Sequence, residues 1–428
     1  MKRYETIRLI SNHISKVTFH AASATKAARS RAGLVLVILA AALPGACSSD
    51  SDPDPGDSSA EAVTTTIDTI DGIIRVTNAG SPPQWQLTQV ASIGPKSLSE
   101  TGSPDEFGRV YDVALGPDES VYVADEMNHE VRVFGVDGVH RFSFGRQGEG
   151  PGEFGRLYSV AWLGGRLLTL DALLGRISEF SAEGEYLGQR RVRGAMGGPP
   201  GWVRFYPVGA DEAYRVTPAV DPAPGRWWEF IGLDSRSETG DTLSLLAGSS
   251  AVTIDCAHGE RISFFEIPFG AKLVQRPGPG GMLYSASTGA YRIALTDAGD
   301  DTVRVIERSL SPEPISDDEW GEGNREYRAL RDSFPLMRCE PLHPPRPDTK
   351  PFIEEIDIAS DGKLWVEVIR ESGNRWEVFD TDGHLLASLP APPRGHLPPA
   401  IGTDHVLTVR QGDFDLEYVD VWRIDRGS

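Results

Sequence analysis

The sequence predicts an all-β fold, a six-bladed β-propeller with four-stranded antiparallel blades, and three observations indicate it. Residues 106–114 read EFGRVYDVA, and residues 153–161, which start 47 positions later, read EFGRLYSVA. Short apolar runs and glycine-containing turns fill the interval, and a period of about 40 to 50 residues of this kind is typical of stacked blades closed into a ring. The chain also ends one strand short of a complete blade.

The first repeat divides into four short strands. Alternating apolar positions predict strands at 111–115, 121–124, 131–134 and 141–144. Polar turns separate them, and Asp137-Gly138 is a two-residue hairpin signal before the fourth strand. Four antiparallel strands in about 45 residues make one blade, which must stack on neighbours to bury its faces.

The four-strand repeat continues to the C-terminus, and its landmarks predict six blades. The expected third strand of each blade is marked by one large apolar residue, namely Phe134, Phe180, Phe230, Leu295, Phe379 and Trp422. The last repeat runs out of residues at Ser428. Residues 85–94 precede the first EFGR motif much as residues 143–145 precede the second, so we expect this N-terminal strand to complete the final blade and close the ring.

Two insertions interrupt the repeats, and the larger one predicts a helix between blades 4 and 5. Ser316 and Glu319 have the spacing of a capping box. The large apolar residues that follow at helical spacing are Trp320, Tyr327, Leu330 and Phe334. Such a helix lies either over one mouth of the central channel as a lid or against a blade edge as padding.

These residues carry a family resemblance. Residues 148–154 (GEGPGEF), the strand ending in Asp125, and residues 128–134 (NHEVRVF) before Asp137-Gly138 resemble the NHL repeat. The chain as a whole is similar to bacterial lipoproteins built as six-bladed propellers of this repeat, which implies a place at the cell envelope. It departs from the repeat on the inner strand, where Asp112 and Ser159 stand in place of the usual glycine.

The N-terminus predicts export from the cytosol. Residues 1–46 hold seven basic residues and one acid, an apolar run at 34–43, and small residues before Cys47. This is the pattern of a signal peptide, too short to span a membrane. We therefore expect residues 1–46 to be removed, residues 47–64 to form a disordered tether, and residues 65–428 to form the propeller.

Cys47 resembles the acylated cysteine of a lipoprotein, and Ser48 after it resembles the outer-membrane sorting pattern. The polar residues 48–57 suit the tether of an anchored domain. A lipid at Cys47 would then be the sole contact with the membrane. The alternative is ordinary cleavage after Ala42 or Ala46, which would leave a periplasmic or secreted protein.

The net charge of the chain limits the classes of partner that it can bind. The chain has a net charge of −20 at pH 7, and without the first 46 residues the value becomes −26. Nucleic acid is excluded as a partner class because its binding depends on cations that displace counterions from phosphate. We expect a monomer that binds a protein, peptide or glycan.

Cys256 and Cys339 both fall in the insertions that separate the third, fourth and fifth blades. In an oxidising compartment they form either a disulfide that pins the two insertions together or two separate buried thiols.

The inner strands hold the candidate binding residues. Arg109 and Arg156 recur at equivalent positions, as do Asp112, Ser159 and Asp357, and side chains at such positions can line the channel. Repetition of this kind also fits an inter-blade ion pair that each blade needs. Asp125 and Asp171 follow the second strand, where an aspartate commonly accepts hydrogen bonds from turn amides.

Catalytic motifs are missing from the sequence. The histidines are scattered without metal-ligand spacing, no serine lies in a GxSxG elbow, and the glycine-rich residues 276–281 are interpreted as a turn. Two functional classes are consistent with the sequence. One is a cell-envelope binding module without a cofactor, which we favour over an enzyme; the other is a Ca²⁺-dependent hydrolase or lyase with carboxylates converging in the channel.

Overall fold

The structure is a computed structural model that describes residues 62–95, 102–192, 203–218, 228–234, 238–245, 251–256, 261–333, 339–340 and 344–427. The predictions for the signal peptide, for Cys47, for residues 47–61 of the tether and for Phe334 lie outside the described residues.

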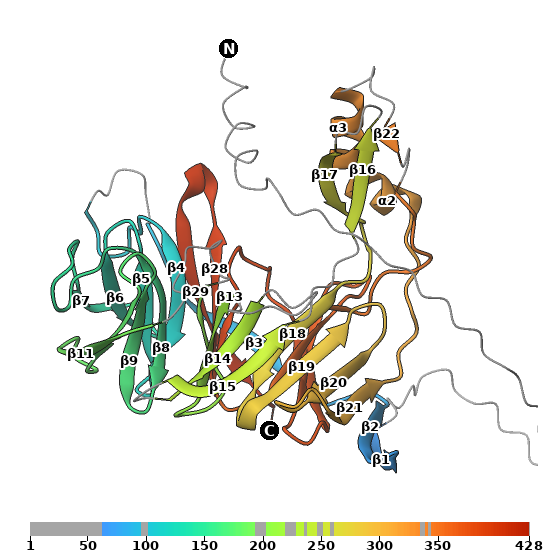
Figure 1. Cartoon of the computed structure of the whole chain (residues 1–428), viewed down its shortest axis with the longest axis horizontal. Coiled ribbons are helices and arrows are strands. Elements are labelled where there is room, and N and C mark those ends of the chain that lie inside the picture. Colours follow the sequence, from blue (N-terminus) through green and yellow to red (C-terminus); the bar gives the residue numbers. More distant parts are fainter. Residues whose placement is uncertain are drawn as a thin grey trace, which may run out of the picture. The chain divides into compact units, whose positions relative to one another are not determined.

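Six sheets have the strand order of a propeller blade, and Figure 1 labels strands of blades 1 to 4 and of blade 6. Blades 1 to 3 are β4 to β7 (Val110–Leu115, Ser120–Asp125, Glu130–Gly135, His140–Phe144), β8 to β11 (Leu157–Leu163, Arg166–Asp171, Arg176–Phe180, Tyr186–Arg191) and β12 to β15 (Phe205–Pro207, Ala213–Pro218, Trp228–Leu233, Glu238–Leu245). Blades 4 to 6 are β18 to β21 (Leu273–Gly278, Met282–Ser287, Arg292–Thr296, Thr302–Arg308), β23 to β26 (Ile353–Ile358, Leu364–Val368, Arg375–Phe379, Leu385–Pro390) and β27 to β29 (Ala400–Ile401, His405–Gln411, Glu417–Asp425) with β3 (Gln86–Ile93). Every landmark residue lies in the third strand of its blade, so the predicted count of six is confirmed.

Each blade packs against the next through apolar side chains. Among the described residues, six hydrophobic clusters form, one at each junction of the ring. They are centred on Val121 (blades 6 and 1), Phe154 (1 and 2), Leu170 (2 and 3), Phe230 (3 and 4), Ile306 (4 and 5) and Trp376 (5 and 6). Strands such as β5 are therefore buried at every position, because both faces of a blade are covered.

The hairpins between third and fourth strands depend on glycine. Gly138, Gly184 and Gly383 stand at equivalent positions with φ of 79°, 81° and 91°. This left-handed region is unfavourable for residues with a Cβ, so the Asp-Gly and Glu-Gly pairs fix where each blade turns.

The N-terminal strand closes the ring as predicted. β3 pairs antiparallel with β29, from Val419 opposite Ile93 to Asp425 opposite Gln86. Side chains reinforce the pairing, since Ser92 donates to the Asp420 carboxylate at 2.6 Å. The final blade thus consists of three strands from one end of the chain and one from the other.

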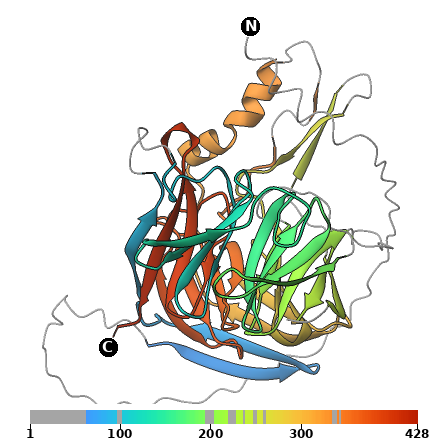
Figure 2. The same cartoon turned by 90° about the vertical axis from the view of Figure 1, so that its left-hand side faces the viewer.

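A hairpin that the repeat period does not predict extends blade 4. β1 (Thr64–Ile70) and β2 (Ile73–Ala79), blue in Figure 2, add two strands to this sheet, and β2 pairs with β21 in parallel. Asn78 fixes the hairpin to blade 5: its Nδ2 donates to the Gly383 carbonyl at 2.9 Å and its Oδ1 accepts from the Leu385 amide at 3.0 Å.

The predicted helical insertion between blades 4 and 5 is confirmed. α2 (Asp317–Gly323) begins with the capping box of Ser316 and Glu319, and α3 (Arg325–Ser333) follows after Asn324. The described chain also has two short 3-10 helices, η1 (Pro279–Gly281) and η2 (Asp413–Asp415). None of the helices in these ranges has the length and apolar character needed to cross a membrane.

The two insertions pair with each other at the predicted cysteines. β16 (Ala251–Cys256) and β17 (Arg261–Glu266) form a hairpin, and β22 (Cys339–Glu340) pairs antiparallel with β16, which places Cys256 directly opposite Cys339. Directly opposed residues of antiparallel strands have Cα atoms about 4.5 to 5.5 Å apart. That separation lies within the range that a disulfide spans.

We expect these two cysteines to be bonded in an oxidising compartment. Alkylation of the denatured chain should leave both thiols unlabelled until a reductant is added, as read by intact mass. In the chain-entropy model, a disulfide that closes a loop of this size stabilises the folded protein by about 4 kcal/mol. Cys256→Ser, Cys339→Ser and the double variant should then lose equal stability, and additive losses would indicate two independent thiols.

Candidate functional site

The inner strands of the blades surround one channel. Arg204, just before β12 of blade 3, forms an ion pair with Asp112 of blade 1 at 3.2 Å. Its Nη1 also donates to the Pro398 carbonyl, which precedes blade 6, at 3.3 Å. Because one side chain reaches both blades across the ring, the inner strands converge on it.

A layer of paired charges fills the middle of this channel. Asp112 accepts hydrogen bonds from the Ser159 hydroxyl and from the Val160 amide, and Ser159 Oγ in turn accepts from the Phe205 amide at 2.9 Å. Burial raises the pKa of Asp112, and the Arg204 guanidinium opposes that rise. Asp112 and Ser159 thus replace the glycine of the repeat with a buried contact between neighbouring blades.

Blades 4 and 5 contribute the other half of the charged layer. Arg276 on β18 lies 3.2 Å from Glu355 and 3.5 Å from Asp357, both on β23. These two carboxylates hold the pKa of the Arg276 guanidinium above its usual value despite burial. Burial raises the pKa of Asp357 to about 6 against the opposing effect of Arg276, and Glu355 adds to the rise. The ring of Tyr206 lies between the two arginines, with both guanidinium carbons 5.9 Å from its centroid.

A cavity of about 610 Å³ opens where the inner strands β4, β8, β12, β23 and β27 end. Most of the side chains that line it are apolar, including Val113, Leu115, Val160, Trp162, Ile358 and Ile401. Arg204 lines this cavity and also belongs to the charged layer. Arg204 therefore connects the charged layer to this cavity, which we call the mouth pocket.

The two arginines of the predicted site lie away from this pocket. Arg156 forms an ion pair with Glu126 at 3.0 Å and lies over the ring of Tyr158, which stacks on Tyr111 with centroids 4.8 Å apart. Arg109 is exposed. The structure thus brings Asp112 and Asp357 into the channel layer but leaves Arg109 and Arg156 outside it.

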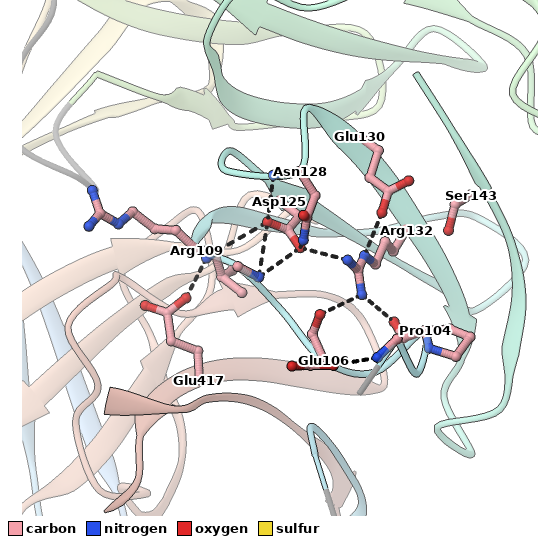
Figure 3. A network of polar contacts seen from close by, with 12 residues as sticks. Pro104, Glu106, Arg109, Asp125, Asn128, Glu130, Arg132, Ser143 and Glu417 are labelled. Atoms are coloured by element: carbon pink, nitrogen blue, oxygen red, sulfur yellow. Dashed lines mark hydrogen bonds and ion pairs between the residues drawn. The ribbon is translucent and has the colours of Figure 1, made fainter. Parts of the chain in front are cut away.

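The repeated EFGR motif is held by the aspartate that follows the second strand. Asp125 accepts from the amides of Gly108 and Arg109 and pairs with Arg132 at 3.1 Å, as Figure 3 shows. Arg132 also donates to the Pro104 and Glu106 carbonyls, whereas the Arg109 side chain points away from this network. These contacts confirm the structural interpretation of Asp125.

Blade 2 repeats this arrangement from a different position. Asp171 accepts from the amides of Gly155 and Arg156 at 2.7 and 3.1 Å. The arginine that binds the carbonyls of the motif is Arg176, two positions earlier in its strand than Arg132. The recurrence of the motif therefore reflects blade architecture.

The repeat pattern of the sequence does not predict the mouth pocket or the two channel arginines, Arg204 and Arg276. Residues 276–281 were expected to form a turn, but Arg276-Pro277-Gly278 ends the inner strand β18, and only Pro279–Gly281 forms the turn. Arg204 lies in a segment that the repeat frame does not cover. Within the described ranges, no group of three or more His, Cys, Asp or Glu side chains has an arrangement that could hold a metal ion.

Comparison with known proteins supports the fold. A family model described as "6-bladed beta-propeller" matches residues 98–195, which contain blades 1 and 2. No curated protein matches the chain.

Solved structures resemble the chain at low identity. A DUF4221-family protein of Bacteroides vulgatus is 10% identical with a TM-score of 0.43, and the match covers 81% of this chain and 100% of that one. A Bacteroides fragilis protein whose name classes it among exported proteins is 11% identical with a TM-score of 0.39 over 79% and 95% of the two chains. Virginiamycin B lyase of Staphylococcus aureus is 9% identical with a TM-score of 0.33 over 79% and 98%. From its own strand order and the partial family match, the chain is a six-bladed β-propeller.

Proposed function

We propose that this chain is an exported binding module of the bacterial cell envelope and that the mouth pocket is its ligand site. The observation that carries the proposal is the pocket itself, a cavity of about 610 Å³ with mostly apolar walls. Sites for small ligands and for anchoring side chains are concave and mostly apolar, with a few polar groups that fix orientation.

The contacts of the channel carboxylates favour binding over metal-dependent hydrolysis. A Ca²⁺ site needs several carboxylate and carbonyl oxygens free to converge on one point. Here Asp112 is engaged by Arg204, and Glu355 and Asp357 are engaged by Arg276. These guanidinium groups occupy the place that a cation would take.

The location at the envelope rests on the N-terminal sequence. The basic segment, the apolar run at 34–43 and the small residues before Cys47 support export and cleavage. A lipid on Cys47 would hold the propeller at the outer membrane through the polar tether. The NHL-like repeats agree with this placement.

An indole placed in the pocket should weaken binding of an apolar probe. Residues 47–428 with Cys47→Ser, which lack both the apolar signal segment and the acylation site, are titrated with N-phenyl-1-naphthylamine, and the fluorescence of the probe is followed. Ala210→Trp and Thr403→Trp place the indole at two exposed residues that line the pocket. Each should weaken binding by about tenfold or more, equivalent to about 1.4 kcal/mol.

Thr66→Trp, on the exposed strand β1, adds the same side chain far from the pocket in sequence and should leave binding unchanged. Equal affinity in all four proteins would place the probe elsewhere and refute the pocket as the ligand site.

A further inference from the structure

The outer edge of the hairpin β1–β2 is unpaired. Within the part of the chain that the structure describes, β1 pairs only with β2, and the strand order of the six-stranded sheet places it outermost (Figure 1). Six of its seven residues are exposed, and Ile67 and Ile70 are 56% and 48% exposed. A free edge of this kind presents amide and carbonyl groups that another strand can pair with.

The free main-chain groups of β1 belong to alternate residues. Asp71 and Gly72 form the two-residue turn of the hairpin, both with positive φ, at 52° and 83°. A turn of this type closes on a hydrogen-bonded pair, here Ile70 with Ile73, and hydrogen-bonded and non-hydrogen-bonded pairs then alternate along the strands. Residues 64, 66, 68 and 70 therefore direct their main-chain groups to β2, and residues 65, 67 and 69 direct theirs to the free edge.

β1 lacks the features that usually protect a free edge. Natural proteins use charged residues, prolines and bulges for this purpose. Asp68 is the only charged residue of β1, the strand has no proline, and its register with β2 runs without a shift. The outermost strands of blades 1 and 2 differ, because β7 carries Arg141, β11 carries Arg190 and Arg191, and both pair with a register shift. The difference indicates that the edge of β1 meets another strand.

The sequence of β1 is complementary to a second copy of itself in antiparallel orientation. In the register centred on residue 67, the main-chain groups of residues 65, 67 and 69 face those of the second copy and form up to about six hydrogen bonds. Aliphatic and threonine pairs of this kind stabilise a sheet, and no two like charges stand directly opposite each other. The opposed pairs are Ile67 with Ile67, Thr65 with Thr69, Thr64 with Ile70, and Thr66 with Asp68.

We infer that two copies of this chain pair edge to edge through β1, antiparallel and about a twofold axis at Ile67. Such a contact uses the same surface on both copies, so it closes as a dimer and continues one sheet across the two propellers. The dimer differs from the monomer expected from the sequence. The inference goes beyond the proposed function, because no residue of β1 lines the mouth pocket.

Charge exchange at residue 67 tests both the pairing and its register. Residues 47–428 with Cys47→Ser form the parent chain, whose mass is followed through a dilution series by sedimentation equilibrium, and we expect a dimer at the higher concentrations. Ile67→Lys places two lysines opposite each other and should raise the dimer dissociation constant by about tenfold or more. Ile67→Glu should do the same. An equimolar mixture of the two variants should restore pairing, because residue 67 is opposed to itself.

Leu187→Lys is the matched control, because Leu187 is 49% exposed on β11, the outermost strand of blade 2. It should leave the dissociation constant unchanged, and all variants should unfold at the temperature of the parent chain. A parent chain that stays monomeric would overturn the inference, as would equal dissociation constants in the parent and Ile67→Lys. A mixture that pairs no more tightly than either charged variant alone would exclude the register at Ile67. Growth into assemblies larger than a dimer would contradict the twofold contact.

Discussion

Deletion of residues 86–93 is expected to abolish the cooperative unfolding transition of the whole propeller. The deletion removes β3, and with it the antiparallel pairing that joins the two ends of the chain in blade 6. β29 would then present an unpaired edge, and the cluster around Ile93, Val121 and Val421 would lose one side. Since each blade buries its faces only against its neighbours, an open ring exposes apolar surface at its break.

Circular dichroism during thermal unfolding measures this effect. Deletion of residues 64–70 is the matched control, because β1 is also an outermost strand but pairs only with β2 and is exposed along most of its length. That variant should keep a sharp transition. A single sharp transition in the 86–93 deletion would show that the ring holds without its closing strand.

Glu377→Ala is expected to destabilise the protein by about 3 to 5 kcal/mol, the usual cost of leaving a buried charge without its partner. Glu377 is fully buried and pairs with Arg308 at 3.2 Å, whose side chain is 2% exposed. Tyr291 donates its hydroxyl to the same carboxylate at 2.8 Å, and Arg375 lies 2.8 Å from it. The substitution leaves the buried guanidinium of Arg308, between blades 4 and 5, without the Glu377 carboxylate. It also removes the hydrogen-bond acceptor of the Tyr291 hydroxyl.

Urea unfolding of the variants measures the change in free energy of unfolding. The double variant Arg308→Met with Glu377→Leu removes both charges and should recover much of the loss, because apolar residues can replace a buried pair. Glu307→Gln breaks the more exposed contact with Arg292 and should cost less than about 1 kcal/mol. A loss in Glu377→Ala no larger than that in Glu307→Gln would contradict a buried network that stabilises the junction.

The architecture could be predicted because the spacing of the repeats determines the number and order of the blades. Phe134 and Phe379 mark the same strand in distant blades, and the Asp-Gly pairs fix the turns, so blade number, strand order and ring closure follow from spacing. The hairpin β1–β2 could not be found this way. It belongs to no repeat, and its parallel pairing with β21 depends on contacts such as those of Asn78 that act over about 300 residues.

The candidate site could be predicted only in part. Inner-strand position placed Asp112 and Asp357 in the channel, but their partners Arg204 and Arg276 come from a linking segment and from a strand that resembles a glycine-rich turn. The mouth pocket arises where five inner strands end, and its apolar residues are indistinguishable in sequence from those of the blade core. Convergence of this kind depends on which side chains of five different blades meet in space, and the spacing of the repeats does not give that.

Closure of the ring by both ends of the chain has a consequence for biosynthesis. Ser92 and its partner Asp420 lie 328 residues apart, so the strand that emerges first must wait for the strand that emerges last. Local pairing can form each blade as its residues become available, but the loop-closure entropy of the final junction is met only after the whole chain is present. The last step of folding therefore follows completion of the chain, and a chain truncated near its end would keep an open ring.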